Sequence, residues 1–115
     1  MMIEVYGLNN CDTCRKARKW LAVEGVEYEF HDIRKANLGD KVIAGWAGKA
    51  GWETLLNRRG TTWRGLPAPD KASVDEASAI RLMTAHPALI KRPVFVAGND
   101  VLVGFTADVQ KALVP

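Results

Sequence analysis

The two cysteines of this 115-residue chain, Cys11 and Cys14, lie three positions apart. A thiolate is the reactive form of cysteine, so a thiol becomes a nucleophile where its pKa is lowered. Two thiols at this spacing can also close into a disulfide or contribute ligands to a zinc site. The elements around the two cysteines decide among these kinds of chemistry.

The pattern around the cysteines predicts a strand, a helix and a second strand. Residues 3–6 and 26–30 alternate apolar and polar side chains, and from Cys11 the apolar positions recur at helical spacing. Asn10 is the expected N-cap of the helix and Gly25 its stop. Strand, helix and strand within about thirty residues form a βαβ unit with parallel strands. Cys11 then falls in the first helical turn, where free N–H groups and the helix dipole stabilise a thiolate.

The rest of the chain predicts a helical middle and a return to strands. Helical spacing and stop signals mark three segments, residues 40–50, 52–56 and 73–83, the last opened by a Ser73–Glu76 capping box. Glycines and prolines predict a loop over residues 57–71.

The C-terminal segments complete the expected order. Residues 94–96 and 101–103 predict a hairpin, followed by a helix that begins at Thr106 or Ala107 and ends at Leu113. We therefore expect one α/β domain over residues 1–115, with β-α-β, a helical insertion at about residues 36–88, and then β-β-α.

A redox role for Cys11 competes with three alternatives. Zinc needs about four ligands, and the two histidines, His31 and His86, do not complete a recognisable zinc spacing, so we expect no metal and structural roles for both. A structural disulfide is disfavoured because no export signal is evident, and we expect a cytoplasmic protein. Cys14 shares the apolar stripe of its helix and is either a core residue or a redox partner. A Cys-x-x-Cys at the start of a βαβ helix is typical of a thioredoxin-like redox motif.

Two arginines and a proline are further site candidates. Pro93 directly precedes the strand at residues 94–96 and is either a cis proline beside an open backbone edge or a trans proline that starts the strand. Arg92 and Arg59 can hold an oxyanion or carboxylate, or can be solvated surface residues. Trp63 lies among polar residues of the predicted loop and is a candidate to line a site.

Composition excludes several classes of partner. The net charge of +3 is spread along the chain without a block of Lys and Arg, so we expect no direct nucleic-acid binding. No apolar run approaches the roughly 18 residues of a membrane span. We expect a monomer.

Three segments resemble the ArsC-like family, which includes glutaredoxin-coupled arsenate reductases, Spx regulators and YffB-type proteins. They read YGLNNCDT followed by RKA from residue 6, LLNRRGTTWR from residue 55, and HPALIKRP from residue 86. The second segment and the sequence NCDT are most similar to the YffB branch.

This resemblance implies a thioredoxin-like core and a set of site residues. Cys11 matches the nucleophilic cysteine, Arg92 the arginine before the cis proline, Pro93 that proline, and Arg59 the active-site arginine of the insertion. It implies a glutathione-dependent thiol reductase with no bound cofactor, glutathione or a small disulfide as co-substrate, and glutaredoxin as a protein partner. Asn10, Thr13 and the main-chain N–H groups of residues 12–14 are expected to form an anion cradle.

The chain departs from the family pattern at two places. Arsenate reductases carry another arginine after the hairpin, where residues 103–106 here read VGFT, which weakens the case for arsenate as substrate. Cys14 is not expected in most YffB-type sequences, whereas Spx regulators use a Cys-x-x-Cys switch that tunes binding to RNA polymerase. An Spx-like regulator is therefore the alternative function. Cys14 either resolves a mixed disulfide at Cys11, forms a redox switch with Cys11, or only packs in the core.

Overall fold

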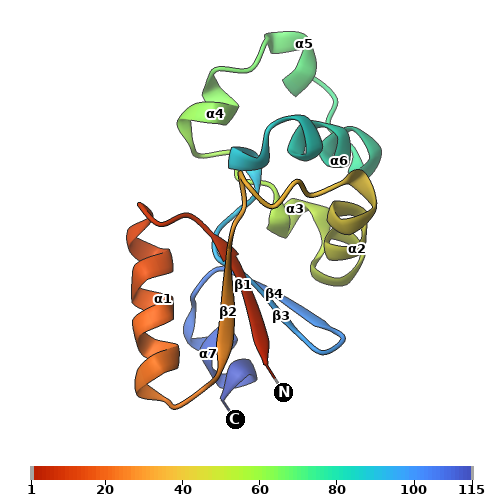
Figure 1. Ribbon diagram of the computed structural model, residues 1–115. Coiled ribbons are helices and arrows are strands. Elements are labelled where there is room, and N and C mark those ends of the chain that lie inside the picture. Colours follow the sequence, from red (N-terminus) through yellow and green to blue (C-terminus); the bar gives the residue numbers. More distant parts are fainter. Residues whose placement is uncertain (1, 115) are drawn as a thin grey trace. The chain divides into compact units, whose positions relative to one another are not determined.

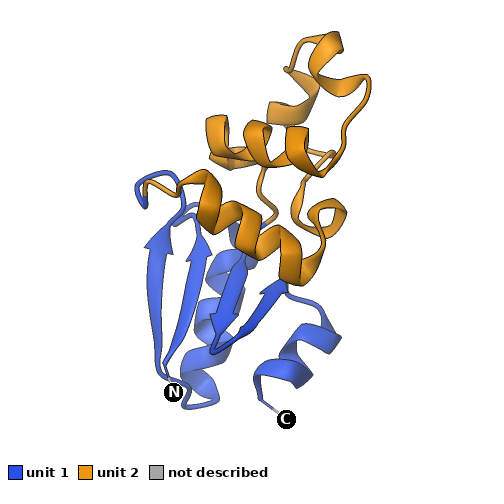
Figure 2. Cartoon of the chain, turned by 90° about the vertical axis from the view of Figure 1, so that its right-hand side faces the viewer, with its two compact units in different colours: residues 1–36, 92–115 blue, residues 37–91 orange. Residues whose placement is uncertain are grey.

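The computed structural model describes residues 2–114, which form two compact units (Figures 1 and 2). The first unit comprises residues 1–36 and 92–115, and the second comprises residues 37–91. The first unit contains β1 (Ile3–Gly7), α1 (Asp12–Val23), β2 (Tyr28–Asp32), β3 (Val94–Ala97), β4 (Asp100–Val103) and α7 (Ala107–Leu113). The second contains α2 (Asp40–Ala50), α3 (Trp52–Leu55), α4 (Thr61–Arg64), α5 (Ala68–Lys71), α6 (Glu76–Ala85) and the 3-10 turn η1 (Pro87–Leu89).

The first unit is built on a mixed sheet with the strand order β2-β1-β3-β4. β1 and β2 are parallel, as the α1 crossover requires, whereas β1–β3 and the β3–β4 hairpin are antiparallel. The register places Val5 opposite both Phe30 and Phe95. The predicted α/β class, a thioredoxin-like core with a helical insertion, is confirmed; the description as one domain stays a prediction.

One face of this sheet carries the core of the first unit. Its buried members come from two strands and two helices: Ile3, Val5, Ala17, Leu21, Phe95 and Val109. They bring α1 and α7 against the same side of β1 and β3. Each large apolar side chain buried in this way contributes about 1.5–3 kcal/mol to folding. This packing fixes the start of α1 at the end of β1.

Gly25 ends α1 as the sequence predicts. Its φ of 71° allows the left-handed turn, and its N–H bonds to the Ala22 carbonyl at 3.1 Å. The next N–H, from Val26, bonds to the Leu21 carbonyl at 3.0 Å, which completes a Schellman motif. Because Val26 takes part in the helix end, β2 begins at Tyr28 and not at residue 26.

The second unit packs α2 against α6. Buried side chains on the predicted stripe of α2, Ile43, Trp46 and Ala47, are matched by Ala79 and Met83 of α6. The bounds of α2 and the end of α6 before Pro87 agree with the sequence pattern.

Two predictions for this unit are wrong. The expected loop over residues 57–71 contains α4 and α5, each a single turn of four residues. The expected Ser73–Glu76 capping box is instead formed by Asp75 and Ser78, whose side chains bond to each other's main-chain N–H at 2.8 and 2.9 Å. Both pairs have capping-box spacing, and here the carboxylate of Asp75 accepts the N–H at the helix start.

The helices of residues 2–114 are also too short or too polar for a bilayer: none has the length and apolar character to cross one.

Candidate functional site

Cys11 occupies the N-cap position of α1, one residue later than the expected cap, Asn10. Its φ of −102° and ψ of 121° are extended, and its carbonyl accepts the N–H of Arg15 at 3.0 Å. An N-cap side chain points toward the free N–H groups of the first helical turn. Cys11 has a sulfur in place of the usual oxygen and makes no regular side-chain capping hydrogen bond, but its position places the thiol at the positive end of the helix.

The surroundings of Cys11 favour its thiolate. Burial by itself would raise the thiol pKa, but the main-chain N–H and the thiol of Cys14 act against it. The hydrogen bond and the charge of the Arg92 guanidinium act in the same direction, and the net effect is a pKa below the ordinary value. Cys11 is half-buried, so an activated sulfur stays accessible to a reaction partner.

Cys14 has the opposite character. Its side chain is fully buried against the end of β1, and both cysteines are reduced. Burial raises the Cys14 pKa to about 11, and its hydrogen bond to Cys11 and the Cys11 charge add to that effect. The main-chain hydrogen bond at Leu8 and the charge of Arg92 oppose the rise without cancelling it. Cys14 is therefore a protonated thiol beside a thiol whose ionisation is favoured.

Arg92 and Pro93 lie in the same unit as the cysteines, directly before β3. The Arg92–Pro93 peptide bond is cis, as the resemblance implies, and the Pro93 side chain is buried. The charge of Arg92 acts on both thiols. Arg92 thus lies close enough to influence Cys11, and its predicted role in holding a negative group of a substrate stays a prediction.

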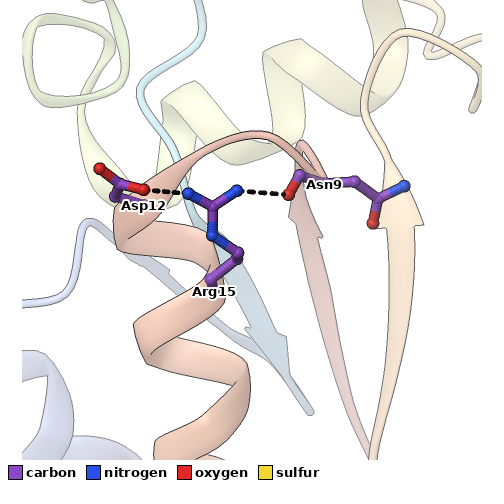
Figure 3. Close-up of polar contacts among 3 residues, drawn as sticks. All are labelled: Asn9, Asp12 and Arg15. Carbon is purple, nitrogen blue, oxygen red and sulfur yellow. Dashed lines mark hydrogen bonds and ion pairs between the residues drawn. The ribbon is translucent and has the colours of Figure 1, made fainter.

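The loop between β1 and α1 is held by two arginines of α1. The Arg15 guanidinium donates to the Asn9 carbonyl at 3.2 Å and also pairs with the Asp12 carboxylate (Figure 3). Arg18 donates to the Asn9 side-chain oxygen at 3.2 Å, and its guanidinium lies 4.1 Å from the Phe30 ring centroid. These contacts tie the loop to the helix.

Asn9 was missed by the sequence analysis as a residue that positions Cys11. Asparagine in a polar turn is a signal for side-chain to main-chain hydrogen bonds. The partners of Asn9 could not be identified in advance, because they come from the first two turns of the helix that follows.

The remaining candidates are less tightly connected to the thiols. Asn10 and Thr13 are exposed and flank Cys11 in the chain, and ligand binding by them stays a prediction. Arg59 belongs to the second unit, where its N–H bonds to the Asn57 side-chain oxygen at 3.0 Å. Its role at Cys11 stays a prediction from the resemblance.

His31 belongs to a polar cluster on the sheet. It stacks on Tyr6 with ring centroids 4.7 Å apart, and its Nε2 lies 3.3 Å from Glu4 and 3.6 Å from Glu29. The β1–β2 register brings these residues together, because it pairs Tyr6 with His31 and Glu4 with Glu29. Within residues 2–114, no three His, Cys, Asp or Glu side chains are arranged to hold a metal ion.

Comparison with known proteins supports the resemblance over nearly the whole chain. The model of the ArsC family matches residues 6–113. A Haemophilus influenzae protein described as uncharacterized is 41% identical over 111 residues, covering 96% of this chain and 97% of its own. The global transcriptional regulator Spx of Streptococcus agalactiae is 28% identical, covering 99% of this chain and 84% of its own. The solved structure of a YFFB protein is 44% identical, covers 98% of this chain and 99% of its own, and superposes with a TM-score of 0.92.

Proposed function

Because the chain belongs to the ArsC family, we propose that it is a thiol–disulfide oxidoreductase, a glutathione-dependent thiol reductase with Cys11 as the nucleophile. One observation carries the proposal: Cys11 caps α1 with its pKa lowered by the Cys14 N–H and thiol and by Arg92, against the effect of burial. Reactive cysteines are typically half-buried and surrounded by donors of this kind.

The reaction that fits this site is a two-step thiol–disulfide exchange. The Cys11 thiolate attacks one sulfur of a disulfide, a Cys11–substrate disulfide forms, and the other sulfur leaves as a thiolate that takes a proton from water. A glutathione thiolate then attacks the mixed disulfide, and Cys11 leaves again as a thiolate. This attack releases a substrate–glutathione disulfide. A second glutathione thiolate attacks its glutathione sulfur, which forms glutathione disulfide and releases the substrate's second sulfur as a thiolate, so one disulfide is reduced while two glutathione molecules are oxidised.

Glutathione suits the second step better than Cys14 does. At pH 7, a thiol with a pKa of about 11 is ionised in roughly one molecule in 10,000. A solvated thiol with an ordinary pKa of about 8.5 is ionised in a few per cent of molecules. Cys14 is in addition fully buried, so an external thiol has the advantage in both ionisation and access.

Arg92 and the residues around Cys11 would hold the negative groups of the partners. Arg92 already supplies a hydrogen bond and a charge to the Cys11 sulfur. Its guanidinium can pair with a carboxylate or with the thiolate that leaves. Asn10, Thr13 and the N–H groups of residues 12–14 surround the same helix start and would complete the anion cradle.

The first experiment measures the reactivity of Cys11 alone. A Cys14→Ser chain leaves one thiol, whose rate of alkylation by iodoacetamide is followed across pH. The inflection should fall below that of free glutathione measured in parallel. An inflection at or above the glutathione value would remove the basis of the proposal.

The second experiment tests glutathione as the co-substrate. After treatment with glutathione disulfide, intact-mass spectrometry should find one glutathione adduct, on Cys11, and none in Cys11→Ser. Turnover of a mixed disulfide of glutathione and a small thiol should likewise require Cys11. If Cys11 is activated but forms no adduct, its role as the nucleophile would stand and the role of glutathione as co-substrate would be refuted.

An Spx-like regulator is the second candidate, because Cys14 contacts Cys11 and the chain is similar to Spx along its length. This function predicts capture of RNA polymerase from a lysate in a manner that depends on Cys11–Cys14 oxidation, with negligible turnover of small disulfides. Pull-downs with oxidised wild type and with Cys14→Ser distinguish the two functions: redox-dependent capture without turnover supports the regulator, and turnover without capture supports the reductase.

A further inference from the structure

The second unit contains a charged pocket that neither cysteine lines. It has a volume of about 350 Å³ and is lined by Glu53, Leu56, Asn57, Arg58, Arg59 and Lys91. This volume lies at the lower end of the range for small-molecule sites. Three cations and one carboxylate line a space with room for a small ligand.

The main chain around the pocket is fixed by hydrogen bonds between two extended segments. The Asn57 N–H donates to the Leu89 carbonyl at 2.7 Å, and the Lys91 N–H donates to the Leu55 carbonyl at 2.8 Å. The Asn57 side chain accepts the Arg59 N–H at 3.0 Å, which shapes the turn that carries both arginines. Lys91 and the arginine pair are therefore presented from neighbouring segments.

Arg58 is held by two tryptophans. Its guanidinium carbon lies 5.4 Å from the Trp52 ring centroid and 5.7 Å from the Trp63 ring centroid, both within cation–π range. Neither contact uses a hydrogen bond of the guanidinium, so its N–H groups can donate to a ligand. Trp63, which the sequence marks as a candidate to line a site, thus supports Arg58 and is not itself part of the pocket lining.

The charges in this pocket are not neutralised by one another. Within residues 2–114, none of its four charged side chains forms an ion pair. Three cations favour carboxylate groups, and the exposed Glu53 favours a ligand that also carries a positive charge. A phosphate would bind the cations but carries no positive charge for Glu53 to pair with.

We propose that this pocket binds a free acidic amino acid. The ligand's carboxylates bind to Arg58, Arg59 and Lys91, and its ammonium group faces Glu53. The proposal goes beyond the reductase function, because it requires neither cysteine and its residues all belong to the second unit. Of these residues, Arg59 is the one that the family resemblance also assigns to the thiol site.

Titration with L-glutamate, followed by nuclear magnetic resonance, tests this assignment in the full chain. The indole N–H signals of Trp52 and Trp63 should shift and saturate, because both rings contact Arg58, whereas those of Trp20 and Trp46 should hold their positions. A ligand of this size in an open pocket binds with a dissociation constant on the order of millimolar. Absence of a saturable shift at Trp52 and Trp63 would overturn the proposal.

Two variants of pocket cations and one control variant distinguish binding in the pocket from a non-specific effect of the protein's net charge. Lys91→Gln and, independently, Arg58→Gln should each weaken glutamate binding by about tenfold, as expected for loss of a charge-assisted contact. Lys111→Gln removes an exposed charge from α7 in the first unit and should leave binding unchanged. Equal weakening by all three variants would show a non-specific charge effect and refute the site.

Glu53 and the chemical class of the ligand are tested with glutarate, which is glutamate without the ammonium group. Wild type should prefer glutamate by about threefold, the value of a partly solvated ion pair, and Glu53→Gln should abolish that preference. Inorganic phosphate binding as tightly as glutamate would refute the amino-acid assignment. Cys11→Ser should bind glutamate normally, so the failure of this proposal and that of the reductase function are distinguishable.

Discussion

Replacing Gly7 with alanine tests how closely β1 packs against the buried thiol of Cys14. A Cβ at Gly7 would lie 2.5 Å from the Cys14 Sγ, 3.4 Å from its Cβ and 3.5 Å from Cε1 of Phe30. Ordinary contact begins at 3.4 Å, so the sulfur has to move by 3.4 − 2.5 = 0.9 Å. Cys14 is completely buried, and forced movement in a packed core costs about 1–3 kcal/mol. Gly7→Ala should lower the free energy of unfolding by this amount.

The sulfur can be removed to show that it causes the loss. In Cys14→Ala, the nearest remaining contact is the 3.4 Å approach to Cβ, which needs little adjustment. Gly7→Ala should then cost less than about 1 kcal/mol, which gives a coupling free energy of about 1–2 kcal/mol in the double-mutant cycle. Urea denaturation of the four proteins under reducing conditions measures this coupling. Gly48→Ala is the matched control, because a Cβ there meets nothing within 4 Å and alanine favours the helix.

The same substitution has a chemical consequence at Cys11. A displaced Cys14 thiol loses its hydrogen bond to Cys11, which is one of the contacts that lower the Cys11 pKa. The Cys11 alkylation profile should therefore move to higher pH in Gly7→Ala. An equal stability loss in the presence and absence of the Cys14 sulfur, with an unchanged profile, would refute the packing argument.

Three further substitutions test other contacts. Arg92→Gln removes a donor and a charge that stabilise the Cys11 thiolate, so the pH profile of iodoacetamide alkylation should shift upward; an unchanged profile would contradict the role of Arg92. Thr106→Ala removes the side-chain acceptor of the α7 N-cap and should lower the free energy of unfolding, measured by urea denaturation, by about 0.5–2 kcal/mol. Thr106→Ser keeps a hydroxyl acceptor and should retain most of the wild-type stability. The N–H and hydroxyl of Ser78 lower the Asp75 pKa in the folded state. Ionised Asp75 therefore stabilises the folded protein above the Asp75 pKa of the unfolded chain, and this stabilisation is lost as the pH falls through the Asp75 pKa of the folded protein. Asp75→Asn should flatten the acid limb of thermal stability measured against pH, and an unaltered acid limb would count against this linkage.

Local patterns were sufficient for the parts of the fold with a strong sequence period. The alternation in β1, the apolar stripe of α1 and the stop at Gly25 predict the βαβ unit, because each is a property of a few neighbouring residues. The activation of Cys11 was also predictable, since it follows from the position of a thiol at a helix start. The cap residue was misplaced by one position because polar Asn10 is a common N-cap and cysteine is not.

Contacts between distant segments were not predictable in the same way. The cluster at His31 depends on the register of β1 against β2, and a shift by one residue would send those side chains to the other face. The close approach of Gly7 to Cys14 depends on how α1 packs on the end of β1. The single turns α4 and α5 contain too few residues to show a helical repeat of apolar side chains. The glycines and prolines of this segment therefore predicted a loop.

The contrast between the two thiols bears on the question of what Cys14 does. The sequence left packing and redox chemistry as alternatives for this residue, but the structure connects them. Burial keeps Cys14 protonated, and only a protonated thiol can donate a hydrogen bond to the Cys11 sulfur. That donated bond is among the contacts that lower the Cys11 pKa, and the charge of Cys11 in turn raises the Cys14 pKa. The burial of Cys14 therefore keeps it able to donate, so packing and the chemistry of Cys11 are two consequences of the same buried position.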